Sequence, residues 1–119
     1  MQVDNLKDYS LFINGEHVRA SGDEQIEALD PATGDSICNI PRGTAGDIDQ
    51  AVGAAREAFP QWRDTAPEER GRILQRIASS IQEREEELTE IVCHDAGKTL
   101  TEARYDVLGA ARNFEYYAG

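Results

Sequence analysis

The sequence predicts a mainly helical chain, in which a β-rich arm with an antiparallel hairpin (residues 1–43) precedes a layer of three to four α-helices (residues 44–119). Three observations lead to this fold class. An Asn-Gly pair separates two short runs near the start, turn residues punctuate the first third, and apolar residues recur at helical spacing afterwards. At 119 residues, the chain has the length of one ordinary domain.

The arm begins with the predicted hairpin. Residues 11–13 form an apolar strand, Asn14-Gly15 is a pair typical of a type I′ turn, and residues 16–18 form the returning strand. Both strands are short.

A second pair of strands is predicted to follow the hairpin. Residues 25–29 alternate polar and apolar side chains, as a half-buried strand does. The turn at residues 30–34, which contains proline and glycine, stops this strand. A further strand covers residues 35–40 and is closed by Pro41.

The first helix is predicted to begin at Thr44, which is spaced from Asp47 as an N-cap residue is from its partner. The apolar residues of this helix that share one face are Ile48, Ala51, Val52, Ala55 and Phe59. Pro60 is expected to end the helix, because an interior proline removes a backbone hydrogen bond. Trp62 would then lie in the connection, where its bulk favours burial as an anchor of the core.

A second helical region is predicted to start with a capping box formed by Thr65 and Glu68, with Pro67 tolerated in the first turn. Its apolar stripe comprises Ile73, Leu74, Ile77, Ala78, Ile81, Leu88, Ile91 and Val92. Residues 82–87 are entirely polar, so the region is either one helix or two.

The last two helical segments meet within a few residues. Gly97 stands where a left-handed residue closes a helix, and Thr99 with Glu102 forms a capping box that opens the next one. The last helix carries an apolar face made of Leu100, Ala103, Val107, Ala110, Ala111, Phe114 and Tyr117. The triplet 97–99 is not a phosphate-binding loop, because Val92 replaces the required glycine and a helix precedes it instead of a strand.

Residue chemistry alone indicates no active site. His94 beside Asp95 suits a histidine that interacts with the helix dipole better than a metal site, because the only other histidine, His17, lies in the distant hairpin. Cys38 and Cys93 are expected to be free, buried and structural. The glutamates between residues 83 and 90 form a solvated face, and the glycine-rich dinucleotide fingerprint is absent.

The charge balance restricts the partners. The net charge is −11, with 23 acidic residues against 12 basic ones, so binding to nucleic acid is not expected. No apolar run approaches the length of a membrane span, and the first residues, including Asp4 and Lys7, lack the apolar core of a signal peptide. A cytoplasmic location is therefore expected.

Taken together, the sequence resembles the beginning of an NAD(P)-dependent aldehyde dehydrogenase. The resemblance runs in order from Ser10 to the last residue, without large gaps. The matching stretches are residues 12–16, 30–35, 49–52, 54–56, 59–62, 70–77, 95–98, 102–103 and 116–119. The family fold is α/β, and the resemblance implies that residues 1–119 are a partial N-terminal segment of its coenzyme-binding domain, with the arm and helices on the outside.

The resemblance also implies a reaction. In a complete family member, a cysteine thiolate attacks an aldehyde, a hydride passes to NAD or NADP, and the thioester is hydrolysed to a carboxylic acid. The cysteine, the glutamate base, the oxyanion-hole asparagine and the coenzyme loop belong to later segments, so neither catalytic nor cofactor-binding residues are assigned here. These 119 residues alone are expected to be inert and to hold no cofactor.

Two sets of residues carry weaker implications of the resemblance. A monovalent cation would be held by the backbone carbonyls of Ala28 and Leu29 and by Asp95. This chain has Asp30 before the proline where the family pattern has asparagine. Gly109 and Asn113 would border the substrate entrance.

The expected partner is the remainder of the dehydrogenase or a second copy of the chain, because the arm and the last helix each present an uncovered apolar face. An alternative is a small acidic interaction protein, or a split-enzyme subunit that binds a separately encoded remainder. A third interpretation is the product of an interrupted gene without function.

The acid excess and the presence of only two lysines also suit a halophile, since concentrated salt screens the repulsion between carboxylates. We expect the melting temperature of the chain, followed by circular dichroism, to rise between low and molar salt. A melting temperature that stays constant or falls across this range would contradict the halophile hypothesis.

Overall fold

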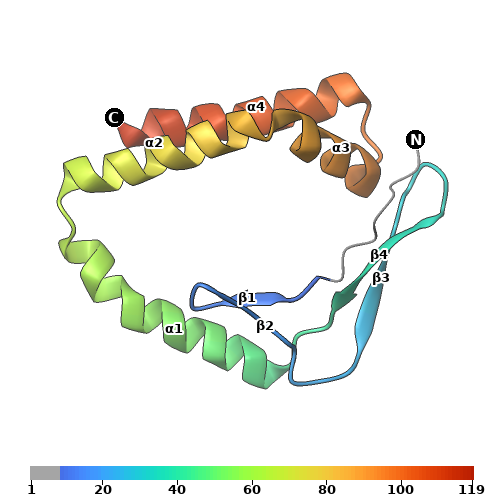
Figure 1. Cartoon of the computed structure of the whole chain (residues 1–119), viewed down its shortest axis with the longest axis horizontal. Helices are drawn as coiled ribbons and strands as arrows, with labels where there is room; N and C mark the ends of the chain where they lie inside the picture. Colours follow the sequence, from blue (N-terminus) through green and yellow to red (C-terminus); the bar gives the residue numbers. More distant parts are fainter. Residues whose placement is uncertain (1–8) are drawn as a thin grey trace. The chain divides into compact units, whose positions relative to one another are not determined.

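The computed structural model describes residues 9–119, so the prediction that no signal peptide is present concerns residues outside this range. Two small antiparallel hairpins precede four helices (Figure 1), which confirms the predicted fold class. The chain forms two compact units. One contains the described residues up to Leu29 together with Gly34–Arg63, and the other contains Asp30–Thr33 together with Asp64–Gly119.

The first hairpin pairs β1 (Leu11–Ile13) with β2 (Glu16–Val18). The φ angles of Asn14 (55°) and Gly15 (79°) are both positive, as a type I′ turn requires. Ile13 is buried, whereas Phe12, on the opposite face, is 65% exposed and contacts the ring of His17 edge-on. The predicted hairpin is therefore confirmed in its position and turn.

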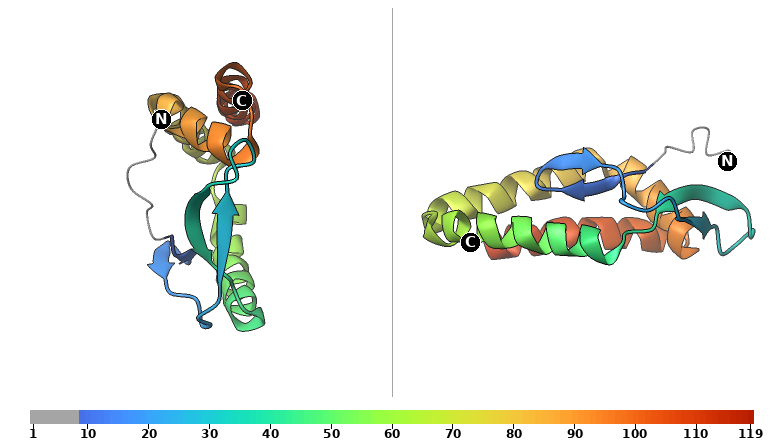
Figure 2. Two further views of the ribbon diagram at one scale, coloured as in Figure 1. Left: turned by 90° about the vertical axis from the view of Figure 1, so that its right-hand side faces the viewer. Right: turned by 90° about the horizontal axis from the view of Figure 1, so that it is seen from below.

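The second hairpin pairs β3 (Gln25–Leu29) with β4 (Ser36–Pro41) as a twisted ribbon (Figure 2). The register places Ile26 opposite Ile40 and shifts by a bulge between Ala28 and Leu29. A half-buried strand has its apolar side chains covered. That prediction was wrong for this strand, since Ile26 is 48% and Leu29 is 51% exposed. The ribbon has only two strands, and these apolar side chains therefore meet too few neighbours to be covered.

Helix α1 (Ala45–Asp64) corrects two predictions. Pro60 lies inside the helix rather than after it, because losing one interior hydrogen bond does not stop a helix whose other turns are intact. Trp62 is consequently part of α1 and is 41% exposed, so it does not anchor the core. The predicted apolar face exists but is not buried, with Ile48 and Phe59 both more than half exposed.

The start of α1 is organised by Asp47, a buried carboxylate. Its Oδ2 accepts hydrogen bonds from the Thr44 backbone N–H (2.7 Å) and the Thr44 hydroxyl (2.9 Å), and its Oδ1 accepts one from the Ser21 hydroxyl (2.6 Å). In return, the Thr44 hydroxyl accepts from the Asp47 N–H (3.3 Å). The predicted cap is confirmed, and it also ties the loop at Ser21 to the helix. The Ser21 hydroxyl, followed by the Thr44 N–H, lowers the pKa of Asp47 from 3.8 to about 2.

The helical unit contains α2 (Pro67–Glu83), α3 (Glu85–Ala96) and α4 (Leu100–Ala118). A break at Arg84 shows that the long apolar stripe forms two helices rather than one. The predicted capping box of Thr65 and Glu68 was wrong. Ala66 is the N-cap residue, without a side-chain hydrogen bond, because Pro67 already occupies the first helical position.

The core of this unit lies where α4 packs beside α2 (Figure 1). Ala78 of α2 and Ala103 and Ala111 of α4 are completely buried, and Val107 is nearly so. The predicted α4 face is thus confirmed for Ala103, Val107 and Ala111. Phe114 is only partly buried, and the other members, Leu100, Ala110 and Tyr117, are exposed. None of the helices among residues 9–119 is both long and apolar enough to cross a bilayer.

Gly71 shows how closely these helices approach. A Cβ atom at Gly71 would lie 2.5 Å from the backbone oxygen of Ala118, the last residue of α4. Gly71 is near the beginning of α2, so the two helices are antiparallel. By contrast, a Cβ atom at Gly109 would meet no atom within 4 Å.

We expect Gly71→Ala to destabilise the chain by about 1–3 kcal/mol, because the new methyl group would force α2 and α4 apart at this end. Gly109→Ala is the matched control. It should stabilise the chain by about 0.5–1 kcal/mol, since alanine is the better helix former. Urea unfolding of the two variants measures both changes, and equal stability of the two would refute the close approach.

A second prediction concerns acid. The pKa of Asp47 is lower in the folded chain (about 2) than its ordinary value of 3.8, so its contribution to stability is complete above pH 3.8. That contribution is lost as the pH falls toward about 2. The stability difference between the chain and its Asp47→Asn variant should therefore shrink across this window in denaturant titrations. Asp49→Asn, at an exposed position in the same turn, is the control, and an equal effect of that variant would contradict the assignment.

Candidate functional site

The junction between α3 and α4 is the best-defined local site in the helical unit. Gly97 ends α3 with φ 65°, and Thr99 opens α4 with both halves of a capping box. The Glu102 N–H donates to the Thr99 hydroxyl (3.3 Å), and the Glu102 carboxylate accepts from the Thr99 N–H (3.4 Å). Both sequence predictions for this junction are confirmed.

The turn at Asp30–Thr33 belongs to the same unit and reaches the end of α3. One carboxylate oxygen of Asp30 accepts a hydrogen bond from the Ala32 N–H (2.8 Å), and the other lies 2.8 Å from His94 Nδ1. Asp30 is 8% exposed. The hydrogen bond with His94, followed by that from Ala32, lowers the pKa of Asp30 below its usual range, so the carboxylate is ionised at neutral pH.

Sequence reasoning missed this pair. His94 was interpreted only as a helix-terminal histidine, and its interaction with the helix dipole stays a prediction. Asp30 and His94 are far apart in sequence, and no local pattern connects them. The one available signal was that Asp30 replaces the asparagine of the family pattern.

Pro31 makes the second contact of the turn with the junction. A Cβ atom on Gly97 would lie 2.7 Å from Cγ of Pro31. Residue 97 therefore has to be glycine for two reasons: its φ angle is positive, and the proline ring occupies the space of a side chain.

Lys98 and Cys93 of the junction are also paired. Lys98 forms an ion pair with Asp106, which raises the pKa of the lysine. The Cys93 thiol donates to the backbone oxygen of Lys98 (3.0 Å). These partners, and the helix that precedes the junction, leave no phosphate-binding loop here.

Both cysteines are free, as predicted. Cys38 is buried on β4, in agreement with a structural role. Cys93 is only partly buried, because its side chain turns toward the loop after α3, and the prediction of full burial was wrong for this residue.

The residues implied to hold a cation are divided between the two units. Ala28 and Leu29 end β3 in one unit, and Asp95 is an exposed residue near the end of α3 in the other. The cation site stays a prediction. Among residues 9–119, no three His, Cys, Asp or Glu side chains come together as metal ligands.

Gly109 and Asn113 both lie on α4. Asn113 is exposed, and Gly109 has open space where a side chain would be. Their position beside a substrate entrance stays a prediction.

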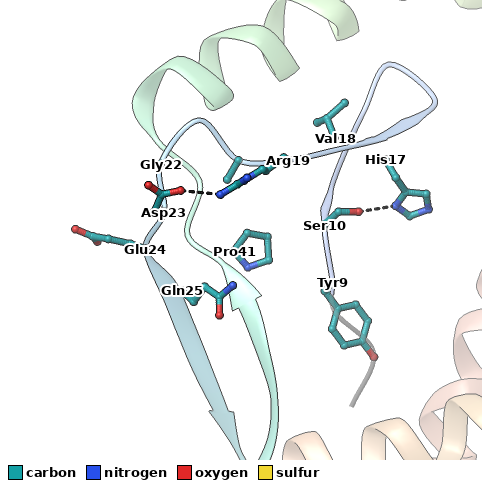
Figure 3. Close-up of a pocket in the computed structure, with 11 residues that line it drawn as sticks. Tyr9, Ser10, His17, Val18, Arg19, Gly22, Asp23, Glu24, Gln25 and Pro41 are labelled. Carbon is teal, nitrogen blue, oxygen red and sulfur yellow. Dashed lines mark hydrogen bonds and ion pairs between the residues drawn. The ribbon is translucent and has the colours of Figure 1, made fainter. Parts of the chain in front are cut away.

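A hollow of about 220 Å³ lies beside the first hairpin (Figure 3). In it, the Ser10 hydroxyl and His17 Nδ1 are 2.9 Å apart, and Arg19 pairs with Asp23 at 2.8 Å. Both pairs are exposed to solvent.

The chain matches the model of the aldehyde dehydrogenase family over residues 17–119. Its fold is similar to that of HpcC from Thermus thermophilus, with 40% identity and a TM-score of 0.91, covering 94% of this chain and 22% of that one. An aldehyde dehydrogenase variant from Bacillus cereus is 36% identical with a TM-score of 0.89, covering 95% and 24%. An NAD-dependent aldehyde dehydrogenase from Sinorhizobium meliloti is 31% identical with a TM-score of 0.90, covering 95% and 23%.

The present chain thus spans less than a quarter of the length of these solved relatives. The family match runs in one continuous stretch from within β2 to the end of the chain, so it includes the second hairpin, the turn at Asp30 and the helices. The sequence identity is well above the level at which only the fold is comparable. The chain belongs to the aldehyde dehydrogenase family.

Proposed function

We propose that these residues are the N-terminal part of an enzyme that oxidises an aldehyde to a carboxylic acid with NAD or NADP. The observation that carries the proposal is the continuous match to the family over residues 17–119. NAD is favoured as the coenzyme because one relative is described as NAD-dependent, and two others, one of them a betaine aldehyde dehydrogenase, are described in complex with NAD.

Within such an enzyme, the role of this segment is structural. Its only sheets are two-stranded and antiparallel within residues 9–119, whereas dinucleotides bind at the carboxyl ends of parallel strands. The described residues therefore do not fit the coenzyme. The nucleophile and the general base would also have to come from residues outside the chain, because the surroundings of Cys38 and Cys93 are those of packed or hydrogen-bonded thiols.

The exposed apolar side chains support contact with further protein. One face of α1 presents Ile48, Val52, Phe59 and Trp62, each between 41% and 60% exposed. Ile26 and Leu29 of β3 are similarly open. Soluble proteins seldom leave so many large apolar residues uncovered, so we infer that the remainder of the dehydrogenase or a second copy of the chain packs on them.

We expect the purified 119-residue chain to form no NADH or NADPH from an aldehyde, because residues 9–119 offer neither a parallel sheet for the coenzyme nor a cysteine in the surroundings of an activated nucleophile. Aldehyde-dependent NADH formation that is lost in Cys93→Ser or Cys38→Ser would overturn this part of the proposal. The two variants also exclude a contaminating dehydrogenase, whose activity they would not change.

The intact mass of the natural gene product, measured under native high-salt conditions, tests the rest. A polypeptide that is much longer than 119 residues and oxidises aldehydes would support the proposal. A 119-residue polypeptide in a specific complex with a separate chain would instead support the split-subunit alternative, and a bare monomer would contradict both.

A further inference from the structure

The turn at Asp30–Thr33 is separated from the strands that it connects. β3 ends at Leu29 in one unit and β4 lies in the same unit, yet the turn between them belongs to the helical unit. The chain therefore passes between the units three times, after Leu29, after Thr33 and after Arg63. Two residues of the turn, Asp30 and Pro31, contact the α3–α4 junction.

We propose that the Asp30–Thr33 turn is a latch that docks on the α3–α4 junction as a separable element, held by the Asp30–His94 hydrogen bond and by Pro31 over Gly97. Releasing it would leave both hairpins and all helices formed.

The hydrogen bond between Asp30 and His94 is mostly shielded from water. The side chain of Asp30 is 12% exposed and that of His94 is 24% exposed. In the Arg19–Asp23 pair, by contrast, the side chains are 87% and 93% exposed. Exposed pairs of the second kind contribute little, because water competes for both partners. A charge-assisted bond that is mostly shielded from water is stronger and fixes the geometry of its partners.

Aspartate suits this position because its two oxygens serve different partners. One accepts from the Ala32 N–H and shapes the turn, while the other faces His94 Nδ1 and holds the turn on α3. Asparagine has only one acceptor oxygen. It could retain the turn and would present an N–H group to His94, so the family's usual residue should keep the shape of the turn and weaken its docking.

The second contact is steric. Pro31 lies where a side chain at residue 97 would be, so glycine leaves the room into which the proline ring fits. The same glycine ends α3, and the helix end is therefore shaped to receive the turn. The polar contact of Asp30 and the apolar contact of Pro31 thus both lie at the end of α3.

Amide hydrogen exchange of the 119-residue chain, read by NMR, tests the latch. His94→Gln removes the Nδ1 atom that lies against Asp30 and leaves the Asp30–Ala32 bond in place. We expect exchange of the Ala32 and Thr33 amides to become about tenfold faster or more in His94→Gln and in Asp30→Asn, since a hydrogen bond to a charged group is lost. Exchange in the middle of α2 and α4 should stay unchanged.

Gly97→Ala should release the turn as well, and Gly15→Ala is its matched control. Both glycines have a positive φ angle, but only Gly97 has an atom within 4 Å of the position of the added methyl group. The alanine at residue 15 should leave exchange at Ala32 unchanged. Unchanged exchange at the turn in both His94→Gln and Asp30→Asn would overturn the latch, as would loss of α2 and α4 protection together with that of the turn.

Discussion

The helical unit depends on how closely α2 and α4 approach each other. Alanine side chains at the contact, Ala78 against Ala103 and Ala111, leave no solvent access and keep the two backbones near each other. Alanines bury little apolar area each, so the pairing relies on shape more than on bulk. The α3–α4 junction has to return the chain along α2 in the correct direction, and the caps at Gly97 and Thr99 supply this reversal.

The shortage of large buried side chains has a counterpart on the surface. Large apolar residues of the described chain, such as Trp62 and Phe59 of α1, are substantially exposed. In the solved relatives, the matching segment is less than a quarter of the polypeptide. The side chains that would gain most from burial therefore lie on the surface of the chain. The 23 acidic residues counter nonspecific association of these apolar faces, because like charges repel each other.

Local signals predicted much of the fold. The Asn14-Gly15 turn, the Gly97 cap and the Thr99–Glu102 box were all correct, because each depends on residues within one turn of the chain. The failures have nonlocal causes. The strand at residues 25–29 was expected to be half buried and Trp62 to anchor the core, yet a sequence pattern shows which residues share a face and not whether anything packs on it. The Asp30–His94 pair joins distant segments, so only the fold could reveal it.

The docked turn also changes where the chain can accept foreign sequence. Hairpin tips are ordinarily good places for inserted tags or fused domains, because they project into solvent and touch nothing. Asn14-Gly15 is such a tip, with open space around its glycine. The tip between β3 and β4 is not, since Asp30 and Pro31 are committed to the end of α3. Of the two hairpin tips, therefore, only Asn14-Gly15 is a suitable place to attach a reporter.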